Sequence, residues 1–334
     1  MRLIFMGTPE FAIPSFRKLL ESRHEVVAVV TQPDRPVGRG QKVSLRPVKA
    51  LAQERALPVL QPEKLKGQDF DKELAPYKPD AIIVIAYGKI LPPEILQLPK
   101  YGCINVHASL LPKYRGAAPV QWSLMAGETE TGVTIMQLDE GMDTGPILAQ
   151  EKVDILDDDD THSLSDMLSV IGAELLAKTL DEIERRGRVE GRPQDSSKAT
   201  LAPMLRKEDG VINWARTSVQ IICHIRAVTP WPGAVTLLDS GMHLKLLRAE
   251  PLWKSEEESL PPNKKLVPGT ITGLFKNLGF SVKTLDGHLL VTRAQPENKR
   301  VMDGTDLVNG GYVKIGAVLG KAPEPPKKEK ANNG

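Results

Sequence analysis

Residues 80–107 read DAIIVIAYGKILPPEILQLPKYGCINVH, and this stretch decides the fold class. Two apolar runs, at 81–87 and 102–107, flank a segment at 91–98 that can form a helix. The run at 81–87 has no polar alternation, which is typical of a strand covered by helices on both faces. A strand, a helix and a second strand in this order predict one unit of a parallel α/β sheet.

The same alternation extends back to the beginning of the sequence. Further apolar runs rich in β-branched residues lie at about 2–7, 26–31 and 57–61, and helical segments lie at about 14–22 and 47–56. We therefore expect a Rossmann-like parallel sheet, whose ligands bind beyond the carboxyl ends of the strands. The first strand is followed by GTPEF, which lacks the G-x-G-x-x-G spacing of a dinucleotide site and argues against NAD.

Beyond this sheet the sequence predicts a long helix, a linker and a second domain. A strand at 132–138 and an extended segment at 146–155 precede a helix over 157–187, which Gly187 ends. The aspartates at 157–160 suit the positive end of that helix better than a metal site. Residues 191–206 lose all periodicity and predict a linker.

The C-terminal part is predicted to be a small OB-like β-barrel. A helix at about 216–228 is followed by strands, and Asp286-Gly287 is a strong hairpin signal. The expected strands cover 233–238, 242–249, 268–274, 279–284 and 288–294. The expected domains are 1–190 (catalytic), 191–206 (linker), 207–318 (barrel) and 319–334 (disordered tail). In TPWPG (229–233) we expect a rigid turn packed on Trp231 rather than a platform for stacked bases.

Composition and charge narrow the class of protein. The chain has 334 residues, of which 41% are hydrophobic, and its longest apolar runs fall far short of the roughly 20 residues of a membrane span. We expect no signal or transit segment, and the two cysteines are too few for a disulfide framework. The net charge is +2, but residues 207–334 carry 18 basic and 13 acidic groups, and 35–49 carries five basic groups and no acid. Such local basic surfaces can bind a polyanion.

The candidate chemistry lies at the end of the strand 102–107. An amide and an imidazole at Asn105 and His107 share one face of that strand and suit a carbonyl that becomes an oxyanion while a proton moves. A carboxylate beside the imidazole would favour its charged form. The best candidate is Asp143, in a Gly-rich loop after the strand 132–138, with Asp139 and Glu140 as rivals. From these residues alone, a structural role for the histidine remains open.

The string from 102 to 148 resembles, nearly end to end, the core of the folate-dependent formyltransferases. Their shared pattern is Asn-x-His, then SLLP, then an Asp in a Gly-bounded loop, and this sequence has Asn105, His107, 109–112 and Asp143 in that order. Four further segments resemble the branch of that family that acts on initiator methionyl-tRNA. They are FMGTPEFA (5–12), VTQPDRPVGRGQK (30–42), INWARTSVQIICHIRAVTPWPGA (212–234) and PGTI (268–271).

The resemblance implies a fold, a reaction and roles for individual residues. The fold is a Rossmann-like formyltransferase domain followed by an OB-like barrel, and the formyl donor is 10-formyltetrahydrofolate, with no metal. Asn105 and His107 would bind the formyl oxygen, and Asp143 would hold the imidazole for proton transfer. The carrier's pocket would be walled by Ser109, Leu110, Leu111 and Pro112.

The resemblance also implies contacts with tRNA. The basic stretch 35–49 looks like an insertion that reaches the acceptor end of the tRNA, with Arg39 first, then Lys42 and Arg35. Phe11, at the carboxyl edge of the sheet, is expected near the methionine side chain. We expect a monomer in the bacterial cytoplasm. The alternatives are a formyltransferase for a small amine, such as a nucleotide sugar or glycinamide ribonucleotide, and a tRNA-binding protein without chemistry.

Overall fold

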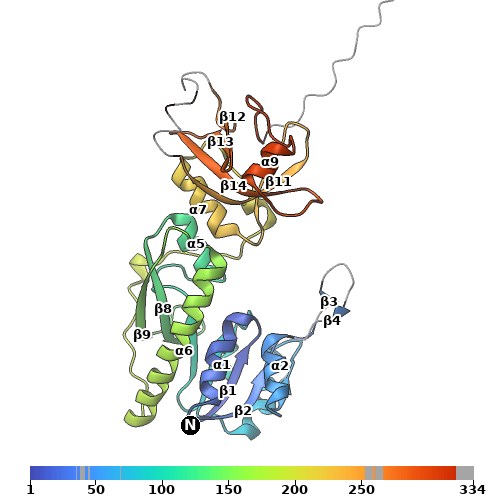
Figure 1. Ribbon diagram of the computed structural model, residues 1–334. Helices are drawn as coiled ribbons and strands as arrows, with labels where there is room; N and C mark the ends of the chain where they lie inside the picture. Colours follow the sequence, from blue (N-terminus) through green and yellow to red (C-terminus); the bar gives the residue numbers. More distant parts are fainter. Residues whose placement is uncertain are drawn as a thin grey trace, which may run out of the picture. The chain divides into compact units, whose positions relative to one another are not determined.

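The computed structural model describes residues 1–34, 36–37, 42–43, 46–67, 69–252, 258, 260 and 266–320 (Figure 1). Contacts within the chain divide it into two compact units. The first comprises Met1–Ser123 and Glu128–Met204, and the second Leu124–Gly127 and Leu205–Gly334.

A seven-stranded sheet forms the first unit, in the order β5-β2-β1-β6-β7-β8-β9. The strands are β1 (Arg2–Gly7), β2 (Glu25–Val30), β5 (Val59–Leu60), β6 (Ala81–Ile85), β7 (Cys103–His107), β8 (Glu130–Gln137) and β9 (Ile147–Asp154). The pairs from β5 to β7 are parallel, whereas β8 and β9 pair antiparallel. The predicted Rossmann-like sheet is confirmed, with an antiparallel edge at β7–β8 and β8–β9. The loop 138–146 joins β8 to β9 without a crossover helix, as an antiparallel pair allows.

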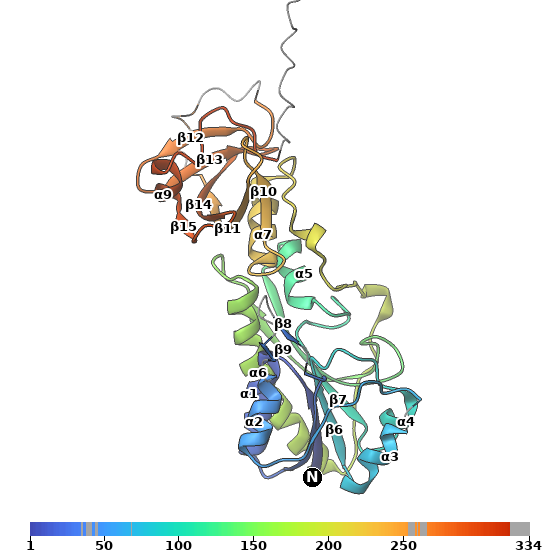
Figure 2. The same cartoon turned by 90° about the vertical axis from the view of Figure 1, so that its right-hand side faces the viewer.

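Helices cover both faces of this sheet (Figure 2). On one side lie α1 (Ile13–Leu20), α2 (Pro47–Glu54) and α6 (Thr161–Arg186), and on the other α3 (Phe70–Leu74) and α4 (Pro93–Leu96). Phe5 of β1 stacks on Phe16 of α1 with ring centroids 4.6 Å apart, and both side chains are fully buried. The helix expected over 91–98 is a single turn, because Pro92 and Pro99 restrict its length.

Helix α6 confirms the long helix expected before the linker. Its N-terminus is capped by Asp160, whose Oδ1 accepts hydrogen bonds from the backbone N–H groups of His162 (2.7 Å) and Ser163 (3.0 Å). Gly187 ends it in the left-handed conformation, with φ 69°. Inside the helix, Gly172 allows close packing on the sheet, since a Cβ there would lie 2.8 Å from Val106 Cγ1.

The segment expected as a linker contacts the first unit along most of its length. Arg115 and Leu201 form an isolated parallel β-bridge, in which the backbone N–H of Arg115 donates to Thr200 O (2.8 Å). The backbone N–H of Ala202 donates to Arg115 O (2.7 Å). Residues 191–204 therefore back the loop that follows β7, although they carry no periodic apolar pattern.

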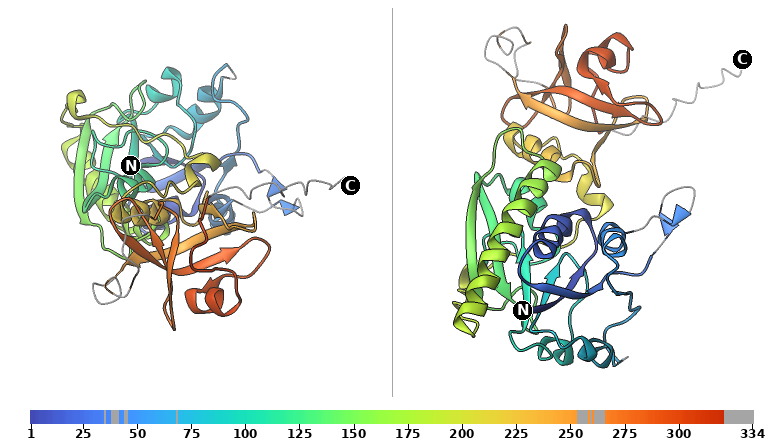
Figure 3. Two further views of the ribbon diagram at one scale, coloured as in Figure 1. Left: turned by 90° about the horizontal axis from the view of Figure 1, so that it is seen from above. Right: turned by 60° about the horizontal axis from the view of Figure 1, so that its bottom comes forward.

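A short antiparallel hairpin interrupts the first unit between β2 and α2. It consists of β3 (Pro36–Val37) and β4 (Lys42–Val43), and it stands away from the sheet of the first unit (Figure 3). Its ends are anchored by Lys49 Nζ, which binds the Asp34 carboxylate and donates to Gln61 Oε1 (2.8 Å). The hydrogen bond from Lys49 lowers the pKa of Asp34.

The second unit is an antiparallel β domain, as expected. Its sheet runs β10-β11-β14-β13-β12, with β15 paired to β14. The elements are α7 (Ser218–Val228), β10 (Ala234–Leu237), β11 (His243–Pro251), β12 (Ile271–Phe275), β13 (Gly279–Lys283), β14 (His288–Pro296), β15 (Met302–Asp303) and α9 (Gly304–Asn309). The hairpin at Asp286-Gly287 is confirmed, because it joins β13 to β14.

Two expectations for this unit need correction. Trp231 is 54% exposed, so the turn does not pack on it. The buried tryptophan here is Trp214, whose Nε1 donates to Thr236 Oγ1 (3.0 Å). The expected disordered tail begins too early, because Leu319 is buried and its N–H donates to Gly269 O (2.8 Å). Residues 321–334 lie outside the described residues.

Candidate active site

Asn105 and His107 lie where the parallel strands end. Both belong to β7, and their alternate positions place the two side chains on one face of the strand. They are 9% and 6% exposed, respectively. In the described part of the chain, no group forms a hydrogen bond with the Asn105 amide, so its N–H donors are available to a ligand.

The ring of His107 has one nitrogen tied to the protein. Its Nε2 lies 2.9 Å from the backbone carbonyl oxygen of Tyr114. A carbonyl only accepts hydrogen bonds, so Nε2 must carry a proton. The other nitrogen, Nδ1, faces the Asp143 carboxylate, with 3.7 Å between Nδ1 and Oδ2. The neutral ring therefore keeps its lone pair on the side of the carboxylate.

The structure separates Asp143 from its two rivals. Asp139 is occupied inside the loop, where its Oδ1 accepts from the Gly141 N–H (3.1 Å) and from Thr144 Oγ1 (2.7 Å). Glu140 is exposed. Asp143 is the carboxylate beside His107, and its Oδ2 also accepts from the Gly116 N–H at 2.8 Å. Its side chain is 15% exposed, and its backbone is left-handed with φ 53°.

The turn Ser109–Pro112 is held by side chains that the sequence did not single out. Thr134 of β8, fully buried, donates through Oγ1 to Ser109 O (2.6 Å) and accepts from the Leu111 N–H (3.1 Å). Gln150 of β9 donates to Leu111 O (2.9 Å). Leu111 is buried in a small apolar cluster with Met136 and Ile147, so its side chain is core. Leu110 and Pro112 are half-buried, and Ser109 Oγ donates to Lys113 O (2.7 Å).

The sequence contained one signal for these supporting residues. Thr134 interrupts the apolar side of GVTIMQL, and a polar residue in a buried strand needs a partner. No comparable signal marked Tyr114, whose partnership with His107 depends on a left-handed backbone (φ 61°) that only the structure shows.

Of the remaining candidate residues, the structure describes Phe11 and, as part of a strand, Lys42. Phe11 lies in the 3₁₀ turn η1 (Glu10–Ala12) after β1 and is half-buried. Arg35 and Arg39 lie outside the described residues, and Lys42 is described only as part of strand β4.

Comparison with known proteins identifies the family. Residues 1–180 match the formyl transferase family, and residues 204–311 match the formyl transferase C-terminal domain. Over 322 residues the chain is 47% identical to the methionyl-tRNA formyltransferase of Geobacter sulfurreducens, covering 96% of this chain and 98% of that protein. The chain belongs to the methionyl-tRNA formyltransferase family.

Solved structures extend the likeness of fold to other formyltransferases. An N-formyltransferase from Helicobacter canadensis, in complex with folinic acid and dTDP-3-aminofucose, is 19% identical, with a TM-score of 0.60 over 86% of this chain and 98% of that one. HypX from Aquifex aeolicus, in complex with tetrahydrofolic acid, is also 19% identical with a TM-score of 0.60, covering 94% of this chain and 48% of that one. At this identity the likeness shows the shared fold.

Beside the site of this formyltransferase, a polar chain fixes the loop that carries Tyr114. The Tyr114 hydroxyl donates to Glu128 Oε1 (2.7 Å), which Lys113 Nζ also contacts (2.9 Å). Burial and the hydrogen bond to Glu128 raise the pKa of Tyr114, and the Lys113 ammonium holds the pKa of Glu128 low. The tyrosine is thus a neutral support at physiological pH.

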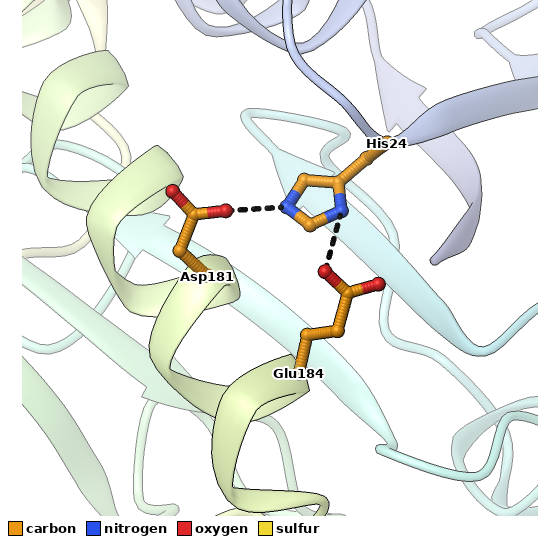
Figure 4. A group of neighbouring side chains, drawn as sticks. All are labelled: His24, Asp181 and Glu184. Atoms are coloured by element: carbon orange, nitrogen blue, oxygen red, sulfur yellow. Dashed lines mark ion pairs between the residues drawn. The ribbon is translucent and has the colours of Figure 1, made fainter.

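A second histidine–carboxylate group lies at the opposite end of the strands. His24 immediately precedes β2, and its ring faces Asp181 and Glu184 of α6 (Figure 4). These three types of side chain can ligate a metal, but both carboxylates already have a cation. Arg23 Nε lies 2.8 Å from Asp181 Oδ1, and Arg23 Nη2 lies 3.0 Å from Glu184 Oε2. We interpret the group as an ion-pair network between α6 and the start of β2.

None of the described helices combines the length and the apolar character that a membrane span requires.

Proposed function

We propose that this chain transfers the formyl group of 10-formyltetrahydrofolate to the α-amino group of initiator methionyl-tRNA. The observation that carries the proposal is the amide of buried Asn105, which has no hydrogen-bond partner among the described residues, beside the His107–Asp143 pair at the carboxyl ends of the strands. It is supported by the 47% identity to a methionyl-tRNA formyltransferase along nearly the whole chain.

In the proposed reaction the amino nitrogen attacks the formyl carbon and forms a tetrahedral intermediate. The Asn105 amide donates to the oxygen on which negative charge develops, with the imidazole of His107 beside it. When the intermediate collapses, the bond between the formyl carbon and N10 of the folate breaks, and the new amide keeps the formyl group. The proton lost by the amine is transferred to N10, which leaves as an amine.

His107 and Asp143 are proposed to manage that proton. Because Nε2 of His107 is tied to Tyr114 O, proton exchange takes place at Nδ1. A proton at Nδ1 makes the ring cationic, and the Asp143 carboxylate 3.7 Å away stabilises this charge. In the described residues no lysine or arginine forms an ion pair with Asp143, so its charge is left for the imidazole.

The turn Ser109–Pro112 is proposed to be one wall of the folate pocket. Thr134 and Gln150 hold its backbone, so the wall is formed before the carrier binds. Fixing a binding loop beforehand reduces the entropy lost when the ligand binds. The chemistry proposed needs no metal, since the formyl group arrives activated on its carrier.

The tRNA is proposed to contact the basic residues Arg39, Lys42 and Arg35, with phosphate contacts from the basic second domain. Phe11 is proposed to line the place of the methionine side chain. The proposed domains are catalytic (1–190) and tRNA-binding with an OB-like topology (207–318). We propose further that the enzyme is a monomer of the bacterial cytoplasm.

Formylation by the purified chain tests the proposal directly. The chain is mixed with 10-formyltetrahydrofolate and either initiator or elongator methionyl-tRNA, and formyl-methionyl-tRNA is measured. We expect transfer to the initiator form and much slower transfer to the elongator form. Equal rates on both tRNAs, or transfer only to a nucleotide sugar or glycinamide ribonucleotide, would overturn the assignment.

The tRNA contact has its own test. We expect Arg39→Ala to raise the KM for methionyl-tRNA at least about tenfold, by the loss of one charged contact of roughly 1.4 kcal/mol or more, while the KM for the folate stays constant. Lys64→Ala, on another part of the first unit, serves as the matched control. An unchanged KM in Arg39→Ala would remove that residue from the tRNA site.

A further inference from the structure

The side chain of Gln194 joins a buried cation to the loop that carries Asp143. Its Oε1 accepts from Arg115 Nε (3.1 Å) and from Arg115 Nη2 (2.8 Å). Its Nε2 donates to the backbone carbonyl oxygens of Asp143 and Gly145, each at 2.8 Å. All four hydrogen bonds of this amide lie within the first unit.

The orientation of the Gln194 amide follows from its partners. A guanidinium only donates and a carbonyl only accepts, so Oε1 must face Arg115 and Nε2 must face the loop. Arg115 is 8% exposed, and the described residues include no carboxylate in an ion pair with it. The positive charge behind Oε1 polarises the amide and strengthens the two hydrogen bonds that Nε2 donates.

The loop needs this support at Asp143, whose backbone carbonyl accepts a hydrogen bond from Gln194. Asp143 has a left-handed backbone, with φ 53°, which is unfavourable for a side chain with a Cβ. This conformation turns the carboxylate toward His107 Nδ1 and the Gly116 N–H. A small rotation of the Asp143 backbone would move Oδ2 away from both.

We propose that Gln194 is a positioning residue for formyl transfer: with Arg115 behind it, it holds the Asp143 backbone so that the carboxylate stays beside His107. The inference rests on the proposed function for its kinetic readout. It also has a readout that does not depend on activity. This readout is the rate of hydrogen exchange at the Gly116 N–H, which donates a hydrogen bond to Asp143 Oδ2.

The variant Gln194→Glu tests separately the hydrogen bonds that Gln194 accepts and those that it donates. Glutamate keeps an oxygen facing Arg115 but has no N–H groups for the carbonyls of Asp143 and Gly145. We expect kcat to fall about 10- to 100-fold, as for other small misplacements of a reacting group, with both KM values changed less than about threefold. We expect hydrogen–deuterium exchange at Gly116, followed by NMR, to speed up at least about tenfold, while the amides of β7 keep their protection.

Two further variants complete the test. Arg115→Lys retains the charge but loses the paired donors, and its kcat should lie between wild type and Gln194→Glu. Gln53→Glu, an exposed position on α2, is the control for added charge and should behave as wild type. A kcat for Gln194→Glu within twofold of wild type would overturn the proposal, as would faster exchange at Gly116 and β7 together, which indicates general destabilisation.

The two proposals can fail separately. If the wild-type chain transfers no formyl group but Gly116 exchange still responds to Gln194→Glu, the proposed function is wrong. The conclusion that Gln194 holds the loop carrying Asp143 would then still stand. If the wild type is active and Gln194→Glu changes neither kcat nor Gly116 exchange, only the positioning role is wrong.

Discussion

Two buried histidines in the first unit lie beside carboxylates, one at each end of the parallel strands. At the start of β2, His24 faces Asp181 and Glu184, and Arg23 pairs with both of these carboxylates. At the end of β7, His107 faces Asp143, and the other described contact of that carboxylate is the N–H of Gly116. The chemical groups are the same, but only at His107 is the carboxylate charge left to the imidazole.

The difference is the reason that we assign a structural role to the His24 group and propose a catalytic role for the His107 group. Where a guanidinium already neutralises the carboxylates, a proton on the histidine would gain little from them. Burial is in fact the main reason that the pKa of His24 is lowered, with the nearby Met1 ammonium as a second cause. A histidine that avoids the charged form is a poor proton carrier, although it packs well between a helix and a strand.

The largest effect is expected from removing the groups proposed to meet the formyl oxygen. Asn105→Ala should lower kcat about 10²- to 10³-fold, as when one oxyanion donor is removed from an enzyme. His107→Ala should lower kcat about 10²- to 10⁴-fold, as when the group that carries the proton is removed. Circular dichroism and the melting temperature should stay close to wild type, which separates chemistry from folding. A kcat within threefold of wild type in Asn105→Ala would contradict its role.

Asp143→Asn probes the carboxylate of the same pair. The amide oxygen can still accept from the Gly116 N–H, but the negative charge beside Nδ1 of His107 is lost. We expect kcat to fall roughly 10²-fold, within the range of acid–base contributions, with little change in the KM for the folate. Asp139→Asn is the matched control, because that carboxylate bonds only within its loop in the described contacts and should retain most activity.

His24→Gln should lower stability and leave kcat nearly unchanged, the opposite of what we expect for the variants of the His107 site. It removes a buried ring that joins α6 to the start of β2, and we expect unfolding of the first unit to become easier by about 1–3 kcal/mol. The melting temperature measures this change, and kcat should remain within about twofold of wild type. A large loss of kcat without loss of stability would show that the two histidines are less different than we infer.

The smallest effect is the pH dependence of stability from His24. Burial lowers its pKa in the folded state below 6.5, so the unfolded chain binds more protons as the pH falls. The free energy of unfolding should therefore decrease from pH 7 to pH 5, and His24→Gln should show a shallower decrease in urea titrations. His224 has a pKa lowered by burial as well, so the comparison of wild type with the variant isolates His24. Equal slopes would exclude a contribution from His24.

Several features could be predicted from the sequence because they depend on local patterns. The central strands, α6 with its Asp160 cap and Gly187 end, and the β13–β14 hairpin follow from periodicity, capping and turn chemistry. Asn105 and His107 share a face because strand residues alternate. Asp143 was identified by motif, and its place in the loop after β8 agrees with that expectation.

Other features could not be predicted from local sequence patterns. The alternation of strands and helices did not reveal that β8 and β9 pair antiparallel, because a buried strand has the same apolar pattern in either direction. Trp231 was expected to be buried, but burial depends on which residues pack nearby, and Trp214 is the buried one. Residues 191–204 read as a linker because their contacts are hydrogen bonds to distant loops, which leave no periodic apolar pattern.

By itself, the sequence determined the α/β class and the family, and it predicted Asn105, His107 and Asp143 as candidate site residues. It could do so because strand alternation and motif spacing are properties of neighbouring residues. Only the tertiary structure decided which carboxylate faces His107, which ring nitrogen is free, and that Gln194 binds the Asp143 loop. Those relations join His107 to residues 36 and 7 positions away and Gln194 to a residue 51 positions away. Their geometry depends on left-handed backbone at Tyr114 and Asp143 that no residue type there requires.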